Sequence, residues 1–218
     1  RAEQVDADNA RSQESSMPND PVPDRGPQET LSYESGEASL EEGQRADLGL
    51  LIHLAAGFQF REDGVVGHLR RIAASVEILA RELGWTEASV QLLKHASVLH
   101  DVGMVDVPEA TLRKKGALTP DETEVVKGHT SLGRVLLQAP GQPILETAAE
   151  LAWTHHERWD GSGYPRGLSG EAIPAHARVL GVADVFDALT TKHPFKEPYP
   201  FDVAIELMRT HAGTHFDP

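Results

Sequence analysis

The sequence predicts an all-α protein. Apolar residues between positions 65 and 84 recur with the helical pattern i, i+3, i+4, i+7. The segment TPDE at 119–122 combines a capping Thr, a Pro at the first helical position and an acid three residues after the cap, which is typical of a helix start. No run alternates between apolar and polar residues with the period of two that strands require.

Further helices follow from the same reasoning. Thr86 is a good N-cap for a helix whose apolar face holds Leu92, Leu93, Ala96 and Leu99. Later helices are expected over about Ser131–Gln138, Ile144–His156 and Pro174–Leu189, with a partial helix after Tyr199. One connection, Arg158–Pro174, is long for a compact domain, and such loops are usually functional.

Composition divides the chain into two parts. The 218 residues carry a formal charge of −14, of which residues 1–48 contribute −8 through 12 acidic and 4 basic residues. Because this stretch is rich in Ser and Pro and nearly free of large aliphatics, we expect residues 1–47 to be a disordered acidic linker. Residues 48–218 form the predicted helical domain.

Several functions are excluded by composition. The absence of cysteine removes disulfides, thiolate metal sites and thiol catalysis. The most apolar run, LGLLIHLAAGF at 48–58, is too short to span a bilayer and lacks signal-peptide flanks, so we expect a cytoplasmic protein without a membrane segment. The acidic balance argues against binding a nucleic-acid polymer.

Histidines and carboxylates extend several apolar helical faces. His100 follows Ala96 by four residues, His155 continues a face of the helix before it, and Asp184 does the same further along. Because an unpaired buried carboxylate is costly, shared cations are the simplest explanation, and Fe, Mn, Zn, Co and Ni all suit such ligands.

The adjacent pairs suggest two cations. Neighbouring residues differ by about 100° around a helix, so we expect His155 and His156 to reach different ions. Asp101, beside His100, could bridge the two. Paired ions of this kind are a common solution for phosphoester hydrolysis.

The chain resembles the HD-GYP family, a branch of the HD metal-dependent phosphohydrolases, from about Gly64 to Pro218. Four segments carry the resemblance: HD at 100–101, GHTSLG at 128–133, HHERWDGSGYPRGLSGEAIP at 155–174 and VADVFDALT at 182–190. The resemblance implies an HD-type helical bundle with a bi- or trinuclear metal centre. It also implies a cyclic di-GMP phosphodiesterase of bacterial signalling, which yields linear pGpG and in some members GMP.

The family pattern assigns roles to individual residues. The implied catalytic residues are Asp101 and Lys196, and Fe or Mn is the implied metal, as two divalent ions. The implied metal ligands are His68, His100, Asp101, His129, His155, His156 and Asp184. The implied substrate contacts are Gly163, Tyr164, Pro165, Arg166 and Lys196, although Arg166, like Arg158, could instead pair with nearby acids.

The sequence departs from the family pattern at three positions. Met104 replaces a lysine expected near the phosphate, at the pocket rim one helical turn after His100. Gly64 stands where members with a third metal carry an acid, and His193 replaces an arginine. The chain starts with Arg1 and stops where the family continues into a further helix, so we expect it to be part of a longer protein with a regulatory or sensor domain.

Other features keep two interpretations. Asp187 could support a ligand or be solvated, and Trp159 could stack on a guanine or pack on the domain. The histidines expected at the surface or in packing are His53, His95, His176, His211 and His215.

Two alternative functions stay open at this stage. One is a catalytically degenerate receptor or scaffold, which the three departures favour and the intact ligand set opposes. The other is a di-iron oxygenase on the same helical frame, against which the GYP segment counts. The substrate partner is cyclic di-GMP in the leading interpretation, and a homodimer is compatible with it.

Overall fold

The computed structural model describes residues 48–58, 65–192 and 197–218, and within these ranges the protein is helical, without a strand. The predicted linker at 1–47 and residues Gly64, His193 and Lys196 lie outside the described residues. No helix of the described part is long and apolar enough to cross a membrane. The helices are α2 (Leu48–Phe58), α3 (Val65–Glu82), α4 (Glu87–Ser97), α5 (Glu109–Leu112), α6 (Pro120–Leu137), α7 (Pro143–Thr154), α8 (Ala175–Thr190) and α9 (Phe201–Arg209), with 3-10 turns η2 (Val102–Asp106) and η3 (Gly170–Ala172).

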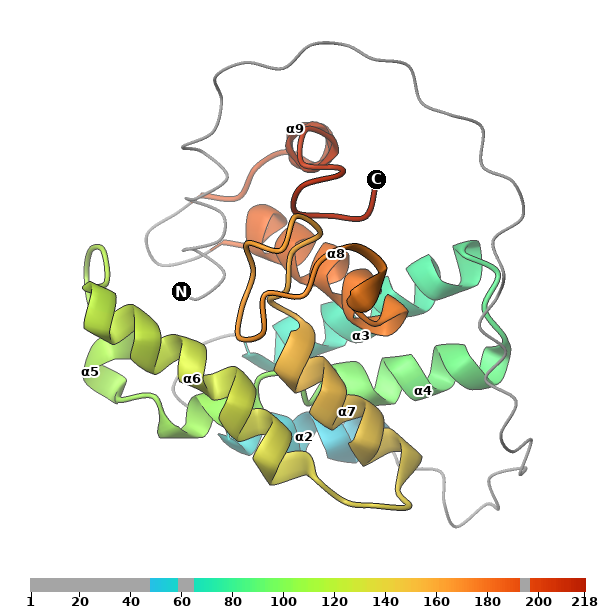
Figure 1. Ribbon diagram of the computed structural model, residues 1–218, viewed down its shortest axis with the longest axis horizontal. Coiled ribbons are helices and arrows are strands. Elements are labelled where there is room, and N and C mark those ends of the chain that lie inside the picture. Colours follow the sequence, from blue (N-terminus) through green and yellow to red (C-terminus); the bar gives the residue numbers. More distant parts are fainter. Residues whose placement is uncertain (1–47, 59–64, 193–196) are drawn as a thin grey trace.

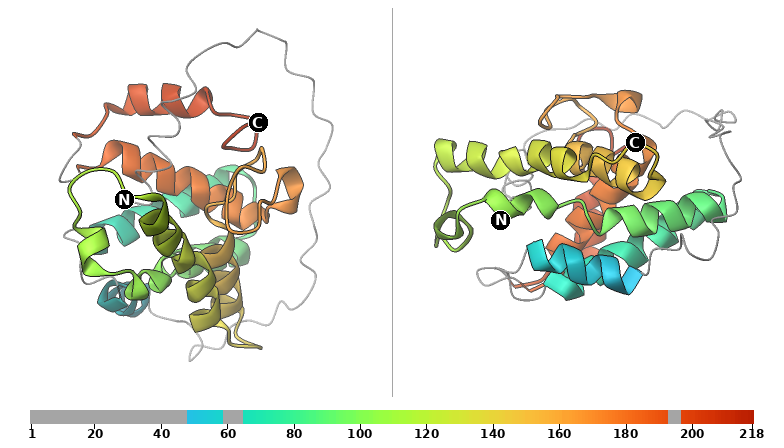
Figure 2. Two further views of the ribbon diagram at one scale, coloured as in Figure 1. Left: turned by 60° about the vertical axis from the view of Figure 1, so that its left-hand side comes forward. Right: turned by 90° about the horizontal axis from the view of Figure 1, so that it is seen from below.

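The helices form a bundle around one main core. Helix α4 packs between α3 and α7, and α6 packs on both α7 and η2. The right-hand view of Figure 2 shows α6 and α7 on one side and α2 and α3 on the other. Helix α8 lies across α3, and α9 contacts α8 at the periphery (Figure 1). The prediction of an all-α fold is therefore confirmed.

Helix starts agree with the capping signals. The Thr86 hydroxyl accepts a hydrogen bond from the Ser89 amide, and α4 begins at the next residue after Thr86. Thr119 and Glu122 form a complete capping box at the start of α6. Each cap satisfies amide groups that the first turn of a helix leaves without a partner.

Helix α6 differs from the prediction of a separate helix near Ser131–Gln138. It is one continuous helix of 18 residues that runs through Gly128. A glycine inside a helix costs only about 1 kcal/mol relative to alanine. Burial of Val126, His129 and Gly133 on one face of α6 outweighs that cost.

Gly103 allows η2 to approach the backbone of α6 closely. A Cβ atom at this position would lie 2.0 Å from the His129 carbonyl oxygen and 2.6 Å from the Gly133 amide nitrogen. Both neighbours are main-chain atoms of a helix, so they cannot move aside independently. The HDVG segment is therefore held against the turn of α6 that carries His129.

We predict that Gly103→Ala lowers the free energy of unfolding by about 3 kcal/mol, the upper part of the range for overpacked interiors. Chemical denaturation measures this change. Gly128→Ala is the matched control, because a Cβ there meets nothing within 4 Å and alanine favours a helix by up to about 1 kcal/mol. Equal stability of the two variants would contradict the close approach.

Candidate metal centre

The seven predicted ligands lie in two adjoining groups. In each group every residue offers one ligand atom, and these atoms lie within 4.8 Å of one another. Helices α3, α6 and α8, the end of α7 and the turn after α4 supply them. The first group is Asp101, His129, His155 and His156, and the second is His68, His100 and Asp184.

Backbone carbonyls orient three of the buried imidazoles. The Nδ1 atom lies 2.8 Å from the Ser97 carbonyl oxygen in His100, 2.6 Å from that of Val126 in His129 and 2.9 Å from that of Leu151 in His155. A carbonyl oxygen only accepts, so Nδ1 carries the proton and Nε2 keeps its lone pair. This arrangement is the usual support of histidines that bind a metal through Nε2.

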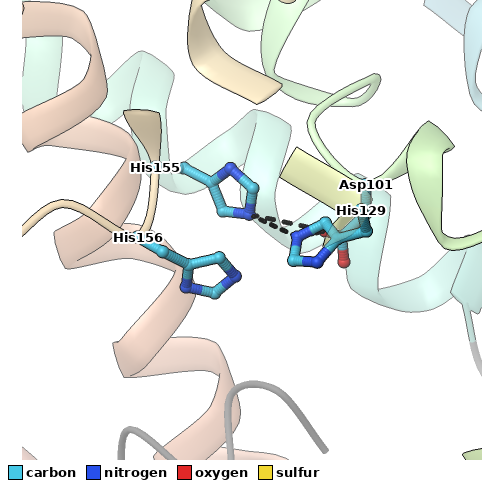
Figure 3. A group of neighbouring side chains, drawn as sticks. All are labelled: Asp101, His129, His155 and His156. Carbon is cyan, nitrogen blue, oxygen red and sulfur yellow. Dashed lines mark hydrogen bonds and ion pairs between the residues drawn. The ribbon is translucent and has the colours of Figure 1, made fainter. Parts of the chain in front are cut away.

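The Asp101 carboxylate lies between the two groups. Its Oδ1 atom is 3.2 Å from His129 Nε2 and 3.4 Å from His155 Nε2, and its Oδ2 atom is 3.6 Å from His100 Nε2. Figure 3 shows the rings of His129 and His155 turned toward each other beside this carboxylate. One carboxylate oxygen thus faces each group.

The donor atoms at this point suit a cation. The Nε2 atoms of His129 and His155 are 3.3 Å apart, and with both protons on Nδ1 they present lone pairs to each other and to Asp101. His100 Nε2 is buried and has no hydrogen-bond partner among the described residues. A divalent metal would satisfy all of these atoms, and five imidazoles with two carboxylates match its preferred nitrogen and oxygen ligands.

Burial sets the protonation of this centre. It lowers the pKa of His100 to about 4, so the ring is neutral near pH 7 and its lone pair is available. Burial alone would raise the pKa of Asp101, but His100, His129 and His155 together outweigh it and hold that pKa well below its usual range. Asp101 is therefore an ionised carboxylate near pH 7.

The second group has a support of its own. His68 Nε2 and His100 Nε2 lie 3.9 and 3.8 Å from Asp184 Oδ1. His68 Nδ1 lies 2.8 Å from Asp187 Oδ2, and Arg71 donates to both oxygens of Asp187. Burial alone would raise the pKa of Asp187, but His68 and Arg71 lower it to about 2. Of the two interpretations of Asp187, the structure supports the one in which it orients a candidate ligand.

Helical geometry predicted that His155 and His156 would reach different groups, and this prediction is wrong. Both belong to the first group, and their ring centroids are 4.0 Å apart. Helix α7 ends at Thr154 and His155 is its C-cap, so His156 lies in the turn that follows. The separation of about 100° applies only inside a helix.

Met104 does not extend a helical face from His100. Helix α4 ends at Ser97, and Met104 lies in the 3-10 turn η2. Its half-buried side chain packs against Val107 and Val126 in a small separate apolar cluster. The helical reasoning that placed Met104 one turn after His100 therefore does not apply, whereas its position at the pocket rim stays a prediction.

The 158–174 loop returns to the histidine pair. Tyr164 stacks on His156 with ring centroids 4.7 Å apart, and its amide donates to the His156 carbonyl oxygen. Gly163 lies against the backbone of 156–158, whereas Pro165 and Arg166 are exposed. The Arg166 guanidinium lies 4.3 Å from the centre of the Trp153 ring, on the surface of α7.

Two remaining aromatic and basic candidates pack locally. Arg158 is buried and donates from Nε to the Ser162 hydroxyl, within the loop itself. The Trp159 amide donates to the His215 carbonyl oxygen, which joins the loop to the C-terminal segment. The five histidines expected outside the site, which include His215, belong to neither group.

A family model for the HD domain matches residues 58–218. The chain belongs to the HD domain family. The cyclic di-GMP phosphodiesterase response regulator RpfG of Xanthomonas campestris is 40% identical over 181 residues, which are 83% of this chain and 48% of RpfG. A cyclic di-GMP phosphodiesterase of Thermotoga maritima is 39% identical over 73% of this chain and 44% of its own length. These relatives confirm the resemblance to the HD-GYP branch.

Other HD domain proteins extend the comparison. A 3'3'-cGAMP-specific phosphodiesterase of Vibrio cholerae is 38% identical over 78% of this chain and 32% of its own length. The structure of Bd1817, an HDG"Y"P protein from Bdellovibrio bacteriovorus, matches 77% of this chain and 56% of its own with a TM-score of 0.56 and 22% identity, which shows the shared fold. The chain spans less than half the length of the three relatives compared by sequence.

Sequence reasoning missed two residues of this HD domain site. Arg71 carries no motif, and its contact with Asp187 joins positions 116 apart in the chain. Glu157 directly follows the histidine pair, yet its buried carboxylate faces the loop rather than the imidazoles. The sequence offered one signal for Glu157, which is its position directly after two candidate ligands.

We predict that Asp187→Asn weakens metal binding at the His68 group by about 10- to 100-fold without abolishing it, the usual effect of removing a support of a ligand. The amide retains shape but loses the charge that orients His68. Titration with Mn(II) measures the affinity. Asp202→Asn, in exposed α9, is the control, and wild-type affinity in Asp187→Asn would contradict the supporting role.

Proposed function

We propose that this HD domain is the catalytic unit of a metal-dependent phosphodiesterase of bacterial second-messenger signalling, which hydrolyses cyclic di-GMP to linear pGpG, with GMP as a further product. The observation that carries the proposal is the Asp101 carboxylate facing two groups of inward-directed donors, beside the loop with Gly163, Tyr164 and Pro165. The names of the HD domain relatives support it, because several are cyclic di-GMP phosphodiesterases.

The proposed cofactor is a pair of divalent ions, with Fe or Mn as the metal. Asp101, His129, His155 and His156 would hold one ion, and His68, His100 and Asp184 would hold the other, with the Asp101 carboxylate shared between them. When bound, such a pair activates water and neutralises charge that develops on the phosphodiester.

Residues of the chain place the substrate. Tyr164 presents its ring beside His156, and Lys127 Nζ lies 5.4 Å from the centre of that ring. The Lys127 ammonium thus places a positive charge beside the loop, whereas Met104 carries no charge. Arg166 and Lys196 remain proposed phosphate contacts, and Lys196 also remains the second proposed catalytic residue beside Asp101.

A second substrate has a specific observation in its favour. Relatives 36–38% identical to this chain are named 3'3'-cGAMP-specific phosphodiesterases. Both cyclic dinucleotides share the phosphodiester ring, so the same centre could open either one. Contacts with the bases would decide which of the two cyclic dinucleotides is the substrate.

The degenerate scaffold is the weaker alternative. Burying the Asp184 carboxylate is costly unless a cation compensates it, and a scaffold without metal gains nothing from that cost. A di-iron oxygenase would keep the ligands but needs no GYP segment. A regulatory or sensor domain, a homodimer and a cytoplasmic location are further parts of the proposal.

We expect Asp101→Ala to lose metal and phosphodiesterase activity together, because the substitution removes the carboxylate that both groups share. The measurements are the metal content of purified protein and an anaerobic assay with Mn(II) or Fe(II) on cyclic di-GMP and 3'3'-cGAMP. Asp106→Ala, an exposed acid in η2, is the control. Two retained ions in Asp101→Ala would refute bridging, and an inactive, fully loaded wild type would refute the phosphodiesterase.

A further inference from the structure

Glu157 is a buried carboxylate that belongs to neither metal group. The residue is 6% exposed. One oxygen accepts a hydrogen bond from the Arg166 amide at 2.7 Å, and the other accepts from the Leu168 amide at 2.8 Å. Hydrogen bonds to a charged acceptor are stronger than neutral ones, so these two contacts can compensate the burial of the charge.

The backbone of residues 156–158, around Glu157, contacts the loop at a second place. The Tyr164 amide donates to the His156 carbonyl oxygen at 3.2 Å. Gly163 comes so close that a Cβ there would lie 2.5 Å from the His156 carbonyl oxygen and 2.4 Å from the Arg158 amide nitrogen. The loop is therefore held from 163 to 168 by the segment that carries the histidine pair.

We propose that Glu157 is a positioning residue for the substrate. By holding the Arg166 and Leu168 amides, it fixes the part of the loop that follows Tyr164 and so keeps the Tyr164 ring stacked on His156. This inference rests on the proposed function for its effect on substrate, whereas its effect on the loop is independent of any activity.

The chemistry requires a carboxylate at this position. Two N–H groups need two acceptor oxygens, and glutamine offers one oxygen and one NH₂ group. Glu157→Gln would therefore set a donor against one of the loop amides. Glu157→Asp retains both oxygens but is one methylene shorter and reaches the two amides less well.

Amide hydrogen exchange and steady-state kinetics on the metal-loaded chain test the proposal. In Glu157→Gln we expect at least tenfold faster exchange at Arg166 and Leu168, and a KM for cyclic di-GMP raised about tenfold with kcat changed less than threefold. Glu157→Asp should show both effects more weakly. Metal content should equal that of the wild type, because Glu157 is not a ligand.

Glu109→Gln is the matched control. Glu109 is exposed in α5 and pairs with Arg113, so exchange in the loop and KM should be unchanged. Wild-type exchange at both amides in the Glu157 variants would overturn the proposal, as would faster exchange with an unchanged KM. If the wild-type chain itself does not hydrolyse cyclic di-GMP, the proposed function fails, while amide exchange still decides whether Glu157 holds the loop.

Discussion

The Asp101 carboxylate is held among the Nε2 atoms of His100, His129 and His155, and the rest of the site depends on this contact. A carboxylate and three Nε2 atoms gathered at one point are the kind of ligand set that a divalent cation prefers. The backbone imposes the arrangement, because the Nδ1 atoms of all three rings are oriented by carbonyl oxygens. The backbone thus aims these donor atoms at a common point.

The architecture of the bundle follows from the need to bring these side chains together. The seven candidate ligands come from five places in the chain, namely α3, α6, α8, the end of α7 and the turn after α4. The glycine at 103 lets η2 approach α6 closely enough for Asp101 to meet His129. On the other side of the centre, the short segment after α7 carries both histidines and the carboxylate that receives the loop. Metal site and loop therefore share one piece of backbone.

Much of the fold, and the histidines and aspartates that gather in the two groups, could be predicted because both leave local signals. Capping residues such as Thr119 act within one turn, and a histidine on an apolar face is visible without coordinates. What failed depends on where helices end. His156 lies just beyond the end of α7, and Met104 lies in η2 rather than on a continuation of α4, so the periodicity of an α-helix does not apply to either residue. The contact of Arg71 with Asp187 is long-range, and no local pattern encodes it.

The most direct test of the central claim is electron paramagnetic resonance of the chain loaded with Mn(II) under anaerobic conditions, with the bound ions counted in the same sample. A carboxylate shared by both groups predicts two ions per chain and the spectrum of an exchange-coupled pair. One ion per chain, or two ions with the spectra of isolated Mn(II), would contradict the account.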